Sequence, residues 1–204
     1  MNYQGLSKEF FLRLINVLKP LFVAVIIVVV LEATSLMSSV SDLGHRAILA
    51  SGLKDASATK GSSINEDLDY QFTIKDLEDK KYSFDQFKGK VIFLNLWATW
   101  CGPCRAEMAD IQKLYSKISS ERIVFVMLSI DKDLDKGKVV NYLKSRKFTF
   151  PAYMPSGFLP SQLRVPAIPT TFIISKEGKI VRKEVGAMNY DTPKFKKFLE
   201  ELSR

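Results

Sequence analysis

The sequence contains only two cysteines and one histidine in 204 residues. A scaffold held together by disulfides would need several cysteine pairs that join distant segments, whereas Cys101 and Cys104 are separated by only two residues. A closed zinc site takes four ligands, and with His45 the chain offers three of the Cys/His type. The scarcity of both residue types therefore argues against a disulfide scaffold and against a metal site, and it leaves redox chemistry for the cysteine pair.

A block of one charge and a long hydrophobic run are also missing. The 30 basic and 22 acidic residues give a formal net charge of +8, but the two signs are intermixed along the chain. We therefore expect a solvated surface with a basic bias and no nucleic-acid partner. The longest apolar run covers residues 21–31, which is shorter than the roughly 20 residues that a helix needs to cross a bilayer.

Three basic residues, Lys8, Arg13 and Lys19, precede this apolar run. Residues 21–40 together reach the length of a membrane span and contain a single carboxylate. Because basic flanks stay in the cytoplasm, we expect residues 1–40 to form a cytoplasmic stub and a transmembrane signal anchor. The remainder would then lie on the extracytoplasmic or periplasmic side of the cell membrane, in a single-pass protein.

A cleaved signal peptide is the alternative for this segment. A basic start followed by a short apolar core fits such a peptide. The best pair of small residues for cleavage, Ala33 and Ser35, comes directly after Glu32, and this fits poorly. Residues 41–66 are rich in Ser, Ala, Gly and charged side chains, so we interpret them as a spacer before a domain at 67–204.

Beyond residue 70 the apolar residues recur with the periods of strands and helices in alternation. A nearly continuous apolar run such as 91–97 predicts a strand that is buried on both faces. The alternation predicts an α/β fold with a central sheet and helices on both of its faces. The expected elements are strands at 70–74, 91–97 and 123–130, a short helical turn at 82–87, helices at 104–120 and 134–147, a hairpin at 171–181 and a last helix from Pro193.

The cysteine pair follows a predicted buried strand and begins a predicted helix. The first turn of a helix has unpaired N–H groups and a partial positive charge, and both favour a thiolate. We therefore expect Cys101, at the exposed edge, to be the attacking sulfur. Cys104, one turn inside the helix, would resolve the mixed disulfide by attacking it in turn. Pro103 suits the first helical turn, where a missing N–H costs little.

The string Trp97-Ala-Thr-Trp-Cys-Gly-Pro-Cys104 resembles the active-site signature of thioredoxins. Its flanks, 89–96 and 105–108, are similar to those of the TlpA/ResA-type membrane-anchored branch, and 165–172 resembles the second signature of the family. The resemblance covers roughly residues 67–204. It implies a thioredoxin-like fold with a helix–strand segment inserted into the sheet region, between Asp131 and Tyr153.

The resemblance also implies roles for single residues. Ile168–Pro169 resembles the cis-proline loop that faces the cysteines and offers backbone groups to an extended substrate; Pro166 is the competing position. Glu107, three residues after Cys104, resembles a carboxylate that shifts the titration of the buried cysteine, with a solvent-facing glutamate as the alternative. Asn95 stands where thioredoxins carry a buried aspartate. The positions expected to bind substrate are Trp100, Gly102, Pro103, Ile168 and Pro169.

The implied function is thiol–disulfide exchange with protein substrates outside the cytoplasm, without a cofactor. The Gly-Pro pair between the cysteines and the Ile before Pro169 resemble reducing members, so we expect a reductant. It would receive electrons from a membrane thiol partner, and apocytochrome c is the substrate that the resemblance suggests. One alternative is a thiol peroxidase, although Ala98 stands where such enzymes place a threonine. The other is a non-catalytic interaction module.

Overall fold

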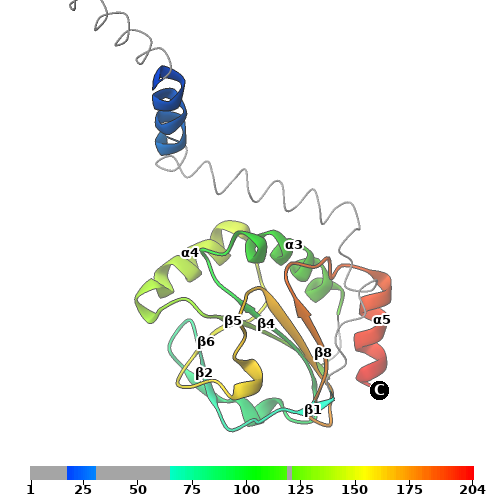
Figure 1. The fold of residues 1–204 in the computed structure, drawn as a ribbon. Coiled ribbons are helices and arrows are strands. Elements are labelled where there is room, and N and C mark those ends of the chain that lie inside the picture. The colour runs from blue at the N-terminus through cyan, green and yellow to red at the C-terminus, as the bar shows by residue number, and fades with distance from the viewer. Residues whose placement is uncertain (1–17, 31–64, 119–120) are drawn as a thin grey trace, which may run out of the picture. The chain divides into compact units, whose positions relative to one another are not determined.

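The structure is a computed structural model that describes residues 18–30, 65–118 and 121–204 (Figure 1). Two compact units divide the chain, one at residues 1–41 and one at 42–204. In the first unit, residues 18–30 form a helix whose side chains are all exposed. Among the described residues, no helix has both the length and the apolar character that a membrane crossing requires. The rest of the predicted anchor, and the predicted spacer up to residue 64, lie outside the described residues.

The second unit is built on one eight-stranded sheet with the strand order β1-β8-β7-β4-β5-β6-β2-β3. Strand β4 lies next to β5, with which it runs parallel, and next to β7, with which it runs antiparallel. The strands are β1 (Glu66–Asp67), β2 (Thr73–Asp76), β3 (Lys81–Ser83), β4 (Val91–Trp97), β5 (Ile123–Ser129), β6 (Ala152–Pro155), β7 (Thr170–Ile174) and β8 (Lys179–Val185).

Strand β4 lies in the middle of the core, and all seven of its residues are buried. Because side chains alternate along a strand, Val91, Phe93 and Trp97 join one apolar cluster. Ile92, Leu94 and Leu96 join another. The first cluster is covered by α3 (Gly102–Lys117), α4 (Lys136–Arg146) and α5 (Pro193–Leu202). The second is covered by the 3₁₀ helices η1 (Phe84–Phe87) and η3 (Ser161–Leu163), so helical segments lie on both faces.

Most predicted elements are confirmed, and the differences lie at the ends of strands and helices. The strand predicted at 70–74 begins only at Thr73; Tyr70 and Phe72 are buried as the alternation requires, but the Phe72 N–H donates to the Tyr70 carbonyl in a turn. The first residues of the turn predicted at 82–87 belong to β3, and η1 begins at Phe84. The inserted helix and strand are α4 and β6, with the 3₁₀ helix η2 (Asp133–Asp135) before them.

Candidate active site

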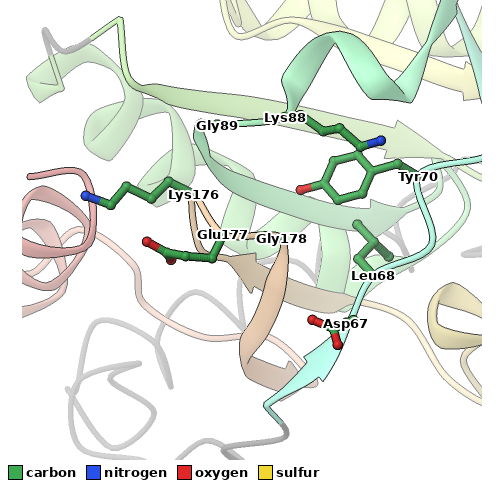
Figure 2. A pocket seen from close by; sticks show the side chains of 8 residues that line it. All are labelled: Asp67, Leu68, Tyr70, Lys88, Gly89, Lys176, Glu177 and Gly178. Carbon is green, nitrogen blue, oxygen red and sulfur yellow. The ribbon is translucent and has the colours of Figure 1, made fainter.

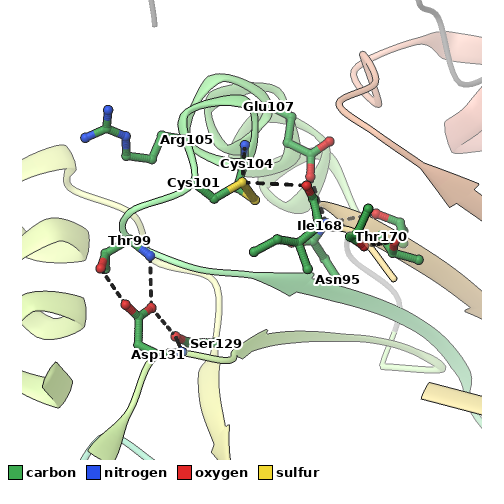
Figure 3. Close-up of a disulfide and its surroundings, with 12 residues drawn as sticks. Asn95, Thr99, Cys101, Cys104, Arg105, Glu107, Ser129, Asp131, Ile168 and Thr170 are labelled. Carbon is green, nitrogen blue, oxygen red and sulfur yellow. Dashed lines mark hydrogen bonds between the residues drawn. A yellow bond between two sulfur atoms is a disulfide. The ribbon is translucent and has the colours of Figure 1, made fainter. Parts of the chain in front are cut away.

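The two cysteines form a disulfide at the first turn of α3 (Figure 3). Cys101 is the N-cap residue of this helix, and its Sγ accepts a hydrogen bond from the Cys104 N–H at 3.2 Å. Pro103 occupies the first helical turn, where its missing N–H leaves no bond unmade. The helix therefore begins at Gly102, two residues earlier than the helical spacing of the sequence predicted, and the Cys104 N–H of its first turn points to the sulfur of Cys101.

Cys101 is more exposed than Cys104, as predicted, but it is less exposed than the prediction required. Cys101 is 6% exposed and Cys104 is fully buried. The expectation that Cys101 lies at an exposed edge was wrong for the disulfide form, because the Ile168 carbonyl oxygen lies 3.8 Å from its Sγ. A disulfide sulfur carries no proton, so this is a van der Waals contact; a thiol at the same place could donate to that carbonyl.

The loop that covers Cys101 contains the cis peptide bond Ile168–Pro169, which is the only cis bond among the described residues. Pro169, not Pro166, is therefore the cis-proline. The Pro169 carbonyl accepts a hydrogen bond from Gly186 N at 2.8 Å, and Thr170 Oγ1 donates to the Ala167 carbonyl at 2.8 Å. These bonds fix the loop against the end of β8 and hold the Ile168 carbonyl over the disulfide.

The five positions predicted to bind substrate lie around the cysteine pair or on the loop that covers it. Trp100 is 68% exposed, whereas Gly102, Pro103 and Ile168 are half-buried. Pro169 is buried, so this residue can offer a substrate little beyond backbone groups. Trp97 is fully buried, and its ring lies tilted against the ring of Tyr142, with 5.9 Å between the ring centroids. This contact agrees with a packing role.

Glu107 lies on the buried side of α3 and is fully buried, so the solvent-facing alternative was wrong. Its Oε1 accepts a hydrogen bond from Asn95 Nδ2 at 2.8 Å, and its Oε2 accepts one from Met188 N at 3.1 Å. Burial raises the pKa of Glu107 to about 8, because removal from water penalises the carboxylate more than these two hydrogen bonds stabilise it; the nearby charge of Asp110 also raises the pKa. The carboxyl group therefore titrates close to neutral pH, three residues after Cys104.

A short row of polar side chains supports Glu107 inside the apolar core. Asn95 on β4 lies opposite Thr171 on β7, and its Nδ2 also donates to Thr171 Oγ1 at 2.9 Å. Tyr190 is buried beside them; burial, together with the charge of Glu107, raises the pKa of its hydroxyl well above the usual value. Asn95 thus keeps Glu107 in place through a group that does not itself titrate.

Sequence reasoning missed a second polar group near the cysteines. Thr99 donates to Asp131 through its N–H at 2.9 Å and through its Oγ1 at 2.6 Å, and Ser129 Oγ donates to the same carboxylate at 2.6 Å (Figure 3). The available signal was a serine and an aspartate two residues apart where a buried strand ends. It could not reveal that Thr99 is their partner.

A separate pocket lies between the start of the domain, the η1–β4 turn and the β7–β8 hairpin (Figure 2). The ring of Tyr70 forms one wall, and a Cβ at Gly178 would meet this ring at 3.3 Å, in a backbone conformation with φ of +86°. Burial, with the charge of Asp85, raises the pKa of Tyr70 to about 12. Neither cysteine lines this pocket, so it is distinct from the candidate active site.

Comparisons with known proteins agree with this geometry. The Redoxin family model matches residues 55–199. The thiol-disulfide oxidoreductase ResA of Bacillus cereus is 37% identical over 116 residues, which are 56% of this chain and 66% of the relative, just under two thirds of its length. ResA of Bacillus subtilis is 33% identical over 128 residues, 62% of this chain and 70% of the relative. The crystal structure of StoA from Bacillus subtilis superposes with a TM-score of 0.51 at 25% identity, and the match covers 70% of this chain and 99% of that chain.

The buried carboxyl group makes a prediction about stability. The folded protein keeps the Glu107 proton up to about pH 8, whereas the unfolded chain releases it near 4.5. Rising pH therefore removes stability from the wild type between these values, by at most about 1.4 kcal/mol per pH unit. The Gln side chain of Glu107→Gln cannot titrate. The free energy of unfolding of the wild type minus that of the variant should therefore fall from pH 5 to pH 8 in urea denaturation.

The matched control is Glu121→Gln, which changes an exposed glutamate. Its free energy of unfolding should follow the wild type in parallel across the same pH range. Parallel curves for Glu107→Gln as well would contradict the raised pKa.

Proposed function

We propose that this chain, which belongs to the Redoxin family and within it to the ResA-type thiol–disulfide oxidoreductases, reduces disulfides of proteins outside the cytoplasm. The observation that carries the proposal is the Cys101–Cys104 disulfide at the N-terminus of α3, against the Ile168–Pro169 loop. The sulfur of Cys101 accepts the N–H of Cys104. That N–H would also stabilise a thiolate on Cys101, which is the form that attacks a disulfide.

The exchange proceeds in two balanced steps from the dithiol form. The Cys101 thiolate attacks one sulfur of the substrate disulfide, which forms a mixed disulfide and releases the first substrate thiolate. Cys104 then attacks the Cys101 sulfur, which closes the disulfide seen in the structure and releases the second substrate thiolate. Two electrons pass to the substrate, and the oxidised protein needs a dithiol donor to return to its starting state.

Glu107 is the proposed proton acceptor for the second step. Cys104 is fully buried and must lose its proton before it can attack, and water does not reach it directly. A carboxyl group whose pKa lies at about 8 can accept and return a proton near neutral pH. Asn95 stands in the place of the usual aspartate and cannot exchange protons, so Glu107 is the titrating group in contact with it.

The direction of electron flow and the substrate rest on the family resemblance. Gly102 and Pro103 between the cysteines, with Ile168 before the cis-proline, resemble the reducing members. We propose apocytochrome c, before haem attachment, as the substrate and a membrane thiol protein as the electron donor. A thiol peroxidase would need a hydroxyl at residue 98, where the chain has a buried Ala98.

The first prediction concerns direction. The Cys101/Cys104 couple of the full-length protein should have a reduction potential at or below about −230 mV, on the thioredoxin side of the known range. Equilibration with dithiothreitol buffers, followed by alkylation of free thiols, measures the reduced fraction. A potential near about −120 mV would identify an oxidant instead. Cys104→Ser is the control and should show no two-electron couple.

The second prediction concerns the transfer of the Cys104 proton to Glu107. Exchange by the wild type should show an inflection near pH 8, because only the ionised Glu107 can take the Cys104 proton. Glu107→Gln should lose this inflection, and at pH 8 its rate of resolving a mixed disulfide should fall by about tenfold or more. Stopped-flow measurements from pH 6 to 9 supply the profile, with Glu121→Gln as the control. An unchanged profile in Glu107→Gln would reject the role.

The third prediction concerns location. We propose that residues 1–40 form a retained signal anchor, with the domain at 67–204 on the extracytoplasmic side and residues 41–66 as the spacer. The protein isolated from membranes should then keep its original N-terminus and remain in the membrane pellet after a high-salt wash. N-terminal sequencing decides the matter, since a start near residue 36 would mean that the segment is a cleaved signal peptide.

A further inference from the structure

The attacking cysteine is presented by a tight turn that connects β4 to α3. The Cys101 N–H donates to the Ala98 carbonyl at 3.2 Å, so Thr99 and Trp100 are the two central residues of the turn. One residue earlier, the Trp97 carbonyl accepts the N–H of Ile130 at 2.8 Å, which ties the end of β4 to the end of β5. The position of Cys101 therefore depends on how firmly this turn is held.

Asp131, which lies beyond the end of β5, accepts hydrogen bonds from Thr99 in this turn. The side chain is buried, with 6% of the residue exposed, and both carboxylate oxygens are used. Oδ2 accepts the Thr99 N–H at 2.9 Å and Ser129 Oγ at 2.6 Å, and Oδ1 accepts Thr99 Oγ1 at 2.6 Å. Hydrogen bonds to a carboxylate are shorter and stronger than those between neutral groups.

Ser129 in turn orients the carboxylate. Its hydroxyl donates to Oδ2 and also accepts the N–H of Asp131 at 3.2 Å, so side chain and backbone are joined in one small ring. Asp131 is thereby fixed before it meets Thr99. The result is a rigid link from the end of β5 to the turn that carries Cys101.

Trp100 shows why such a link is needed. Its side chain is 68% exposed, so packing against the core contributes little to its orientation. Thr99, Trp100, Asp131 and Tyr142 line one surface pocket. The indole therefore lies beside the hydrogen bonds between Asp131 and Thr99, which we call the tether. The backbone of the turn, and hence Asp131, sets where the indole stands relative to Cys101.

We infer that Asp131 is a positioning residue, which fixes the Thr99–Trp100 turn so that a protein disulfide meets the Cys101 sulfur and the Trp100 indole in one arrangement. This inference rests on the proposed exchange activity. It assigns to Asp131 an effect on rate and none on the equilibrium between dithiol and disulfide, because both directions of exchange pass through the same arrangement of sulfurs.

Two variants of matched shape test the tether. Asp131→Asn removes the charge and one acceptor, and Thr99→Val removes only the hydroxyl donor. Because misplacement of a reacting group by about 1 Å can cost up to about 10²-fold in rate, we expect each variant to reduce insulin about tenfold more slowly than the wild type. Asp133→Asn is the control, since this exposed carboxylate lies two residues away and pairs with Lys75.

Three readouts are compared at a temperature where urea denaturation shows every variant to be folded. They are the second-order rate with insulin, the equilibrium constant with glutathione, and the rate of the Asp131→Asn/Thr99→Val double variant. We expect slower rates for both single variants and an equilibrium constant within twofold of the wild type. The double variant should be no slower than the slower single variant, because the hydroxyl bond that Thr99→Val removes is one of the bonds that Asp131→Asn already disturbs.

Rates within twofold of the wild type in both single variants would overturn the inference. So would a slow Asp131→Asn beside a normal Thr99→Val, because the Thr99 hydroxyl would then not help to hold the turn. An equilibrium constant that shifts with the rate would also overturn it, because the charge of Asp131 would then act on the thiolate. A lower denaturation midpoint with an unchanged rate would assign Asp131 a role in folding alone. Failure of the proposed function is distinct from all of these, because then the wild type itself would not reduce insulin.

Discussion

The hydrogen bond from the Cys104 N–H to the Cys101 sulfur is the interaction on which the site depends. It makes Cys101 the N-cap of α3, so the redox disulfide and the start of the helix are one structural feature. Strand β4, buried on both faces, brings the chain to this point, and the α3 residues that follow bury Cys104 and Glu107. The apolar core on either side of β4 therefore fixes the positions of the two sulfurs.

Two buried carboxyl groups, in contrasting environments, flank the cysteine pair. Glu107 lies among apolar side chains with two hydrogen-bond donors, and its burial favours the protonated form at neutral pH. Asp131 accepts three hydrogen bonds, two from Thr99 and one from Ser129. One group is suited to moving a proton and the other to holding a turn, although both are short acidic side chains near the same disulfide.

The Ile168–Pro169 loop and the Thr99–Trp100 turn approach the disulfide from different parts of the chain. The loop covers the Cys101 sulfur with a carbonyl, while the turn leaves the Trp100 indole in solvent. A substrate segment that reaches Cys101 must therefore share the surface with a fixed backbone edge and an exposed aromatic ring. Hydrogen bonds anchor each side, through Gly186 for the loop and through Asp131 for the turn.

The sequence by itself determined what depends on neighbours along the chain. The buried run at 91–97 and the helix that starts at the cysteines were predictable, because periodicity and motif spacing are local. The cis-proline position came from the family resemblance, since the residues alone say only that an X–Pro bond can be cis. The two- and three-residue strands β1 and β3 were not, since such short, mostly exposed segments carry no period. Only the tertiary structure decided that Glu107 is buried and that Asp131 meets Thr99, 32 residues away. Helical spacing gives the side of α3 on which Glu107 lies, but what covers that side depends on strand order, and strand order is set by packing between distant segments.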